Sequence, residues 1–313
     1  MEVKLRIMLR NWSYSEFKEI LYKEAKEGKD HINTNTYKRI YAYLRTLELR
    51  KQNLSYNKIR RIINSEIGYT PPKSELSYWL RGLCTPLTKI TVFDVHQPEV
   101  GLLLGLILSD GCEYQRYCYN HLYGARERFF NRNEAIIREF KEACSKLGLT
   151  VYGSLDPPKL GRQCWRFGIN STLLYLLLKR YDVFIVKAPT NVQRAFLRGL
   201  WLGDGHIGYE AIFYNTDLNL IKIVEKLLRA HNIKYFREGP YRPKPKNLPD
   251  KPTYKPMYLV CIDIRSWQEF LELTGFAESP LRPFYLLWIN KVSFNFISRG
   301  RDFHRQGNSP CLF

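Results

Sequence analysis

The sequence predicts an α+β fold in which one pattern of helices and strands occurs twice, after an all-α N-terminal segment. Two observations predict this. The stretches 101–111 and 195–205 are near copies of each other, 94 positions apart. The patterns that follow each stretch also come in the same order: helix, two strands, helix, two strands, helix. We therefore expect two pseudo-symmetric αββαββα repeats that share a central two-helix interface.

The repeated stretches read GLLLGLILSDG and AFLRGLWLGDG, with a small residue at every fourth position. Small residues four apart lie on one stripe of a helix, and a stripe without bulk lets a second helix approach closely. Each stretch ends in Asp–Gly, and Gly commonly ends a helix. Two such helices, packed together, would bring Asp110 and Asp204 side by side. The alternative is two buried apolar helices that each happen to end in Asp.

Paired carboxylates indicate a cation. Two crowded carboxylates repel each other unless a positive ion lies between them, and the negative ends of two helix dipoles add to that attraction. Hard oxygen ligands of this kind suit Mg²⁺, or another divalent cation such as Mn²⁺. A membrane-spanning role is excluded for these stretches, because each apolar run has about 9 residues and a span needs roughly 20.

These stretches resemble the paired signature motifs of the LAGLIDADG homing endonucleases, in the monomeric form with both motifs on one chain. The resemblance covers residues 97–290, and two copies make it specific. It implies that Asp110 and Asp204 are catalytic and hold metal ions together with the backbone carbonyls of Ser109 and Gly203. It departs from the family pattern where Leu replaces the acidic residue two positions before each Asp; that residue is not a metal ligand in the family.

The resemblance also implies a basic residue at the edge of each site, where it would stabilise the transition state or shift the pKa of the attacking water. In the first half the match is Lys187, just before the second signature helix. In the second half Arg282 is the nearest base, which leaves the symmetry of the two sites open. An ordinary surface lysine is the alternative for Lys187.

The composition favours a polyanionic partner. The chain has 49 Lys and Arg against 30 Asp and Glu, a net charge of +19, and 14% aromatic residues. Such a balance is typical of proteins that bind DNA or RNA. Seven cysteines without a C-x-x-C pair argue against a zinc site and a disulfide framework; whether Cys112 and Cys118 pair stays open. No targeting or membrane segment is visible, so we expect a cytoplasmic protein.

Residues 1–96 are predicted to form a separate helical domain. Apolar residues recur at helical spacing over 15–26 and 36–49. A helix capped by Ser55, a turn, and a second helix from about Ser74 then resemble a helix-turn-helix. Its second helix would offer Lys73, Ser74 and Ser77 to a DNA groove. A helical hairpin that binds nothing has the same pattern. A linker at 85–98 would lead into the first repeat, 97–188; the second repeat is 189–295, and 296–313 form a basic tail.

The strands supply the predicted DNA-binding surface. Apolar residues alternate with polar ones over 163–169 and 258–265, which leaves one sheet face polar. A β-ribbon fits the major groove, where Arg reads guanine and Asp accepts from cytosine. Residues 238–256, rich in Pro and Lys, are predicted to form a long hairpin tip that contacts phosphate. The candidates are Arg116, Arg126, Arg128, Arg162, Arg166, Arg237, Arg242, Lys244, Lys246, Lys251, Lys255, Asp263 and Arg265. A solvated sheet face is the alternative for each strand position.

Together these observations predict a monomeric, site-specific DNA endonuclease that makes metal-dependent double-strand breaks at a long asymmetric site. A free-standing or intron-encoded protein fits the ends of the chain better than an intein. Two alternatives use the same fold: a maturase that helps an intron RNA to splice, and a regulator that binds DNA without cutting it. Both Asp residues weigh against the regulator, because a protein that only binds does not need them.

Overall fold

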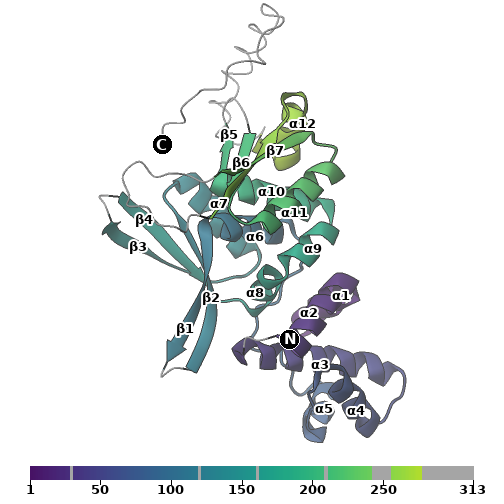
Figure 1. Ribbon diagram of the computed structural model, residues 1–313. Coiled ribbons are helices and arrows are strands. Elements are labelled where there is room, and N and C mark those ends of the chain that lie inside the picture. Colours follow the sequence, from purple (N-terminus) through teal and green to yellow (C-terminus); the bar gives the residue numbers. More distant parts are fainter. Residues whose placement is uncertain (29–30, 119–120, 160–161, 208–210, 242–254, 277–313) are drawn as a thin grey trace, which may run out of the picture.

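The computed structural model of the 313-residue chain describes residues 1–28, 31–118, 121–159, 162–207, 211–241 and 255–276. In Figure 1 the N-terminal helices lie at one end of the molecule, and the two α+β repeats lie beyond them. Within the described residues, no helix is both long enough and apolar enough to cross a membrane.

The N-terminal helices follow the apolar spacing of the sequence. Within α2, Phe17, Ile20, Leu21 and Ala25 recur at helical spacing and are buried. The predicted cap holds: the Ser55 side chain accepts a hydrogen bond from a backbone N–H at the start of α4. The five helices are α1 (Glu2–Ser13), α2 (Ser15–Glu27), α3 (His31–Lys51), α4 (Tyr56–Ile67) and α5 (Lys73–Leu80).

The predicted linker is not a free linker. Five apolar residues between 87 and 95 are buried in the hydrophobic core. Helix α1 holds the same segment with polar contacts: Asn11 donates to the Phe93 carbonyl at 2.9 Å, and Lys4 donates to the Ile90 carbonyl at 2.9 Å. The segment was predicted to be a connection between domains, but its apolar residues pack into the core. The N-terminal helices are therefore tied to the repeat that follows.

Both repeats have the predicted order of elements. The first contains α6 (Pro98–Asp110), β1 (Gly111–Cys118), β2 (His121–Asn131), α7 (Glu134–Lys146), β3 (Val151–Lys159), β4 (Arg162–Ile169), α8 (Thr172–Lys179) and α9 (Tyr181–Lys187). The second contains α10 (Thr190–Asp204), β5 (Gly205–Ile207), β6 (Ala211–Asn215), α11 (Leu218–Ala230), β7 (Tyr235–Tyr241), β8 (Met257–Ile262), the 3₁₀ helix η1 (Ile264–Ser266) and α12 (Trp267–Thr274).

The two antiparallel sheets have the same topology, β1-β2-β4-β3 and β5-β6-β8-β7. Their registers correspond as well, since Gly111 pairs with Phe129 and Gly205 pairs with Phe213. In each sheet the buried Phe of the second strand faces the helical layer: the ring of Phe129 stacks on Phe140 of α7 with centroids 4.4 Å apart. The predicted α+β fold of two pseudo-symmetric repeats is confirmed.

One predicted strand ends earlier than expected. The alternating pattern over 258–265 predicted a strand to Arg265, but β8 ends at Ile262 and η1 follows. Asp263 caps that 3₁₀ helix, because its side chain accepts a hydrogen bond from the Arg265 backbone N–H at 2.9 Å. A carboxylate that caps a helix start competes with the strand ladder. The predicted alternation is also wrong here, since Val260, Cys261 and Ile262 are all buried.

Candidate metal centre

The candidate centre lies where helices α6 and α10 end. The two helices cross at their glycines: a Cβ on Gly105 would lie 2.9 Å from the Gly199 Cα, and a Cβ on Gly199 would lie 3.0 Å from the Gly105 Cα. Toward the N-termini of the two helices, a Cβ on Gly101 would clash with the Val192 carbonyl. Toward their C-termini, a Cβ on Gly203 would clash with the Ser109 side chain. Contacts in this order mean that the helices run parallel, so both C-termini are at one end, as the small-residue stripe predicts.

This packing brings the two carboxylates together. A Cβ on Gly203, the residue before Asp204, would lie 3.3 Å from the Asp110 Cγ. Both Asp residues are half-buried. Burial raises the pKa of the Asp110 carboxyl, and burial together with the negative charge of Asp110 raises the pKa of Asp204 to about 6. Each carboxylate is thus held in a place that disfavours its charge.

Two asparagines, placed identically in the two repeats, orient the carboxylates. Asn131 donates from Nδ2 to Asp110 Oδ2 at 2.7 Å, and Asn215 donates from Nδ2 to Asp204 Oδ2 at 2.9 Å. The Oδ1 atoms of these asparagines accept hydrogen bonds from the backbone N–H groups of Asn133 and Asp217, at 2.7 and 2.8 Å. Because those N–H groups can only donate, they fix the amide orientation and direct each Nδ2 to its carboxylate.

Sequence analysis missed these asparagines as site residues. Phe129-Phe130-Asn131 and Phe213-Tyr214-Asn215 are a visible repeat of the same motif, at the end of the second strand in each half. The signal was therefore present. What the sequence does not show is the contact, because Asn131 and Asp110 are 21 positions apart and meet only when β2 lies beside the end of α6.

The donor set fits a divalent cation. Two desolvated carboxylates with raised pKa values lie at the negative ends of two helix dipoles, and a positive charge there would relieve both costs. Ser109 and Gly203 lie in the last turns, where helix carbonyls have no partner within the helix. Among the described residues, no group of three or more His, Cys, Asp or Glu side chains is placed to hold a metal ion, so the ligands that this centre offers are the two carboxylates and these carbonyls.

Lys187 is not brought to this centre. It ends α9, just before α10 begins, whereas Asp204 ends α10. A helix of 15 residues is roughly 22 Å long, which places Lys187 at the far end of the helix pair. Its Nζ lies 3.8 Å from Glu16 Oε1 of α2. The prediction that Lys187 lies beside the carboxylates is therefore wrong. Arg282 lies outside the described residues.

Five predicted DNA-binding arginines share one face of the first sheet. Register pairs Arg128 with Gly168 and Phe130 with Arg166, and alternation along each strand places the remaining positions on that face, opposite Phe129 and α7. We call this the open face of the first sheet. Its arginine positions are 116, 126, 128, 162 and 166. Arg128 and Arg166 already have interactions within the protein.

The other predicted DNA-binding residues are placed differently. Arg237 pairs in register with buried Val260, on the helix-covered face, and its Nη1 lies 3.4 Å from Glu225 of α11. Arg237 therefore does not lie on the sheet face that was expected to contact DNA. Arg265 forms a bidentate ion pair with Asp263, so neither is the free strand residue that was expected. Lys255 is exposed, while Arg242, Lys244, Lys246, Lys251 and the tail 296–313 lie outside the described residues.

Comparison with known proteins identifies the class. Residues 191–275, which cover most of the second repeat, match the family described as "LAGLIDADG-like domain". The predicted family resemblance is confirmed, and this chain carries a LAGLIDADG-like domain over residues 191–275.

Among curated proteins, the uncharacterized protein MJ0398 of Methanocaldococcus jannaschii is 26% identical over 191 residues, which cover 59% of this chain and 68% of that protein. A structure of mesophilic variants of the homing endonuclease I-DmoI is 18% identical, with a TM-score of 0.42 over 56% of this chain and 94% of that chain. Full-length DUF199/WhiA from "Thermatoga maritima" is 15% identical, with a TM-score of 0.46 over 65% and 66% of the two chains.

Proposed function

We propose that this chain is a DNA endonuclease that needs a divalent metal ion and cuts both strands of a duplex at a long asymmetric site. A LAGLIDADG-like domain is compatible with a nuclease or with a protein that only binds DNA. The observation that favours cutting is the pair of half-buried carboxylates, Asp110 and Asp204, each oriented by its own asparagine. A protein that only binds DNA gains nothing from two carboxylates that repel its phosphates.

The roles follow from position. Asp110 and Asp204, with the carbonyls of Ser109 and Gly203, would hold Mg²⁺ or Mn²⁺, which when bound polarises the phosphate and makes a bound water more acidic. The asparagines would hold each carboxylate in its orientation through their hydrogen bonds to Oδ2. Because both repeats lie on one chain, the centre needs no second copy, and we propose a monomer.

Binding is assigned to the sheets. The five arginine positions on the open face of the first sheet suit a β-ribbon in a major groove, where Arg donates to guanine. Phosphate neutralisation by the basic chain would add affinity that falls with salt. Intron RNA as a second partner and a cytoplasmic setting remain part of the proposal.

A DNA-binding protein that does not cut is the second candidate. The observation that favours it is the position of Lys187, the expected basic neighbour, which lies at the far end of the helix pair from the carboxylates. The same experiment separates the two candidates.

The test exposes a randomised duplex library to the protein with Mg²⁺ and sequences the ends produced. The unsubstituted protein should cut one long site, and Asp110→Asn or Asp204→Asn should each lower the rate at least about 10³-fold, since a metal and its ligands supply several kcal/mol of transition-state stabilisation. Asp182→Asn, an exposed carboxylate on α9, is the matched control and should cut normally. Selective binding without cutting, unchanged by both substitutions, would favour the second candidate.

A further inference from the structure

The α3–α5 unit carries a surface that the proposed nuclease centre does not use. Between residues 50 and 83 the sequence has seven Lys and Arg and two Glu. Both glutamates are engaged inside the unit. Glu75 accepts from Arg39 at 2.6 Å and from the Tyr69 hydroxyl at 3.1 Å, while Glu66 accepts from Arg45 at 2.8 Å and from the Tyr41 hydroxyl at 2.9 Å. The positive charge is therefore left to face the solvent.

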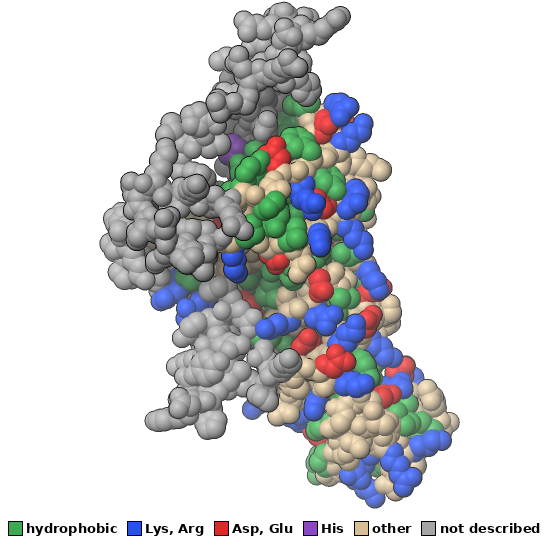
Figure 2. Space-filling view, in the orientation of Figure 1, with side chains coloured by type: hydrophobic (Ala, Val, Ile, Leu, Met, Phe, Trp, Pro, Cys, Tyr) green, Lys and Arg blue, Asp and Glu red, His purple; other side chains and the backbone are tan. Residues whose placement is uncertain are grey.

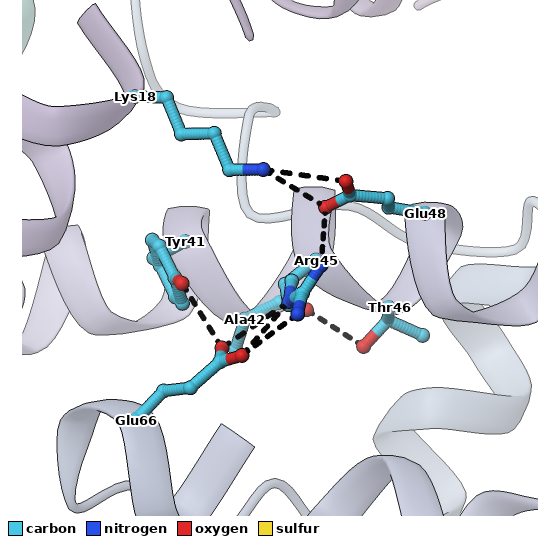
Figure 3. Close-up of polar contacts among 7 residues, drawn as sticks. All are labelled: Lys18, Tyr41, Ala42, Arg45, Thr46, Glu48 and Glu66. Atoms are coloured by element: carbon cyan, nitrogen blue, oxygen red, sulfur yellow. Dashed lines mark hydrogen bonds and ion pairs between the residues drawn. The ribbon is translucent and has the colours of Figure 1, made fainter. Parts of the chain in front are cut away.

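Internal pairing extends through the neighbouring helices. Figure 3 shows Arg45 between Glu48 and Glu66, with Lys18 of α2 reaching Glu48 at 3.2 Å. These contacts join α2, α3 and α4 into one block and use up the acidic side chains at their interface. Figure 2 shows Lys and Arg side chains spread over the outer surface of the N-terminal helices.

Helices α4 and α5 are set as a rigid pair. Helix α4 is capped at its C-terminus by Gly68, whose φ of 61° and ψ of 33° place it in the left-handed region that favours glycine. Arg60 then donates to the Pro71 carbonyl at 2.8 Å across the turn. Leu76 and Trp79 bury the inner side of α5. A short helix held by its inner side against two others, after a glycine-containing turn, is the arrangement of a helix-turn-helix.

The outer side of α5 is polar, basic and aromatic. Positions 73, 74, 77, 78 and 81 follow helical spacing away from the buried residues. Lys73, Ser74 and Arg81 are exposed, and Tyr78 is 47% exposed. On α4, Lys58 and Arg61 are exposed. None of these four basic residues has an ion-pair partner among the described residues.

The unit is docked on the first repeat. The Tyr37 hydroxyl of α3 donates to the Thr172 carbonyl, at the start of α8, at 3.3 Å. The neighbouring helix α2 contacts the same repeat: the ring of its N-cap residue Tyr14 lies edge-on to Phe184 of α9, and Glu16 pairs with Lys187. Helix α3 also contacts β2. In Figure 1 the N-terminal helices accordingly lie beside α8 and α9. Lys187, which sequence analysis assigned to the nuclease centre, thus belongs to this junction.

We propose that α5 binds the major groove of duplex DNA flanking the half-site of the first repeat, and that this docking fixes the direction in which the pseudo-symmetric core lies on its target. An α-helix fits the major groove of B-form DNA, whereas the deep, narrow major groove of an RNA helix does not admit side chains. Lys73, Ser74, Ser77 and Tyr78 reach the groove, and Lys58, Arg61 and Arg81 neutralise phosphates. The proposal rests on the proposed function only for the location of the core on DNA.

The test measures binding in EDTA, so that cutting plays no part. A non-cutting Asp110→Asn/Asp204→Asn protein selects its site from a randomised duplex library, and its footprint is mapped on both strands. The double substitution Lys73→Ala/Arg81→Ala in that protein should weaken binding at least tenfold at about 0.1 M salt. It should lower the salt slope by about two and remove protection from one flank only. Lys222→Ala/Lys226→Ala removes the same charge from exposed positions on α11 and should leave that flank protected.

Truncating the target supplies the second measurement. Removing the flank that loses protection should weaken the non-cutting protein as much as the α5 double substitution does, and the two changes together should cost no more than either alone. Equal footprints and affinities for the α5 and α11 variants would overturn the proposal. Preference of the chain for an RNA helix of the same sequence would also overturn it. A failed cleavage assay leaves these readings intact, so the two proposals fail separately.

Discussion

The two repeats carry the same framework around their acidic residue but present different sheets. In each, a Gly-containing helix ends at Asp, and an Asn at the end of the second strand donates to that Asp. The open face of the first sheet has five arginine positions. The equivalent face of the second sheet, within the described residues, includes His206, Ile212, Tyr214, Phe236, Glu238, Leu259 and Cys261.

This difference separates what the fold must preserve from what it can vary. The glycines lie at the crossing of α6 and α10, and the carboxylates lie at the ends of these helices, where a change in one repeat displaces atoms of the other. The two sheets share no paired strands. The open face of the first sheet and the equivalent face of the second can therefore vary independently. If both faces bind DNA, the first half-site should be richer in guanine contacts than the second, which matches an asymmetric target.

The largest effect should come from the helix crossing, where the two repeats are in closest contact. A Cβ on Gly105 would lie 2.4 Å from the Phe196 carbonyl oxygen, and a Cβ on Gly199 would lie 2.5 Å from the Leu102 carbonyl oxygen. We expect Gly105→Ala and Gly199→Ala each to cost about 3 kcal/mol or more in the free energy of unfolding, which the helix propensity gained, about 1 kcal/mol, does not offset.

Urea unfolding measures both costs. Gly168→Ala, a strand position whose added Cβ meets nothing closer than 3.8 Å, is the control and should stay near the native value. A large loss for one helix and none for the other would show that the crossing is not symmetric.

The next effect concerns the asparagines. Asn131→Ala and Asn215→Ala should each lower cutting about 10- to 100-fold, the range for groups that orient metal ligands. Each removes a hydrogen bond that lowers the pKa of its carboxyl, so the pKa of that Asp rises and the pH profile of cutting moves upward. Rates measured between pH 5 and 9 check this. Asn191→Ala, which removes an exposed amide at the other end of α10, should leave the profile unchanged; an unmoved profile for both site variants would contradict the assigned role.

Much of this framework was predictable because it is local or repeated. The small-residue stripe predicted the parallel helix pair, and the duplicated pattern predicted both sheets. The misassignments have two kinds of cause. Lys187 is close to the second signature helix in sequence, but it precedes the N-terminus of a helix whose C-terminus holds Asp204. Sequence proximity was taken for spatial proximity, and a whole helix lies between.

Sheet faces illustrate a second limit. Arg237 lies on a strand and is basic, yet register places it opposite Val260 and beside Glu225. Which of two faces a strand residue occupies changes with a shift of one residue, so pairing decides it. Asp263 likewise could extend a strand or cap a 3₁₀ helix, and in the structure it caps the 3₁₀ helix η1.

A smaller effect should distinguish the two carboxylates by stability. The folded pKa of Asp204, about 6, lies above its ordinary 3.8, so the folded protein holds this proton more tightly than the unfolded chain does. The associated stability is fully present below about pH 4 and is lost as pH rises through 6. In EDTA at pH 7.5, Asp204→Asn should therefore be more stable than the native protein, by on the order of 2 kcal/mol.

Unfolding at pH 4 and 7.5 checks this sign, since the advantage of Asp204→Asn should disappear at the lower pH. Asp110→Asn should gain less, because the pKa of Asp110 is raised by burial alone. Adding Mg²⁺ at pH 7.5 should stabilise the native protein and reverse the order, if the pair holds the cation. An Asp204→Asn protein less stable than the native one at both pH values would contradict the raised pKa.

The smallest effect compares the helices that follow the asparagines. Asn133 caps α7 and Asp217 caps α11, each by accepting a hydrogen bond from the backbone N–H two residues on, at 2.9 and 2.8 Å. Asn133→Ala and Asp217→Ala should each cost about 1 kcal/mol in the free energy of unfolding. Asp217 should cost a few tenths of a kcal/mol more, because a negative charge interacts favourably with a helix N-terminus, and because its carboxylate also accepts from the Tyr181 hydroxyl at 3.3 Å. In about 1 M NaCl the charge part of that excess should vanish, since salt screens exposed charges within a few ångströms. Equal costs at low salt would mean that the two repeats are equivalent at this position too, and that their divergence is confined to the sheets.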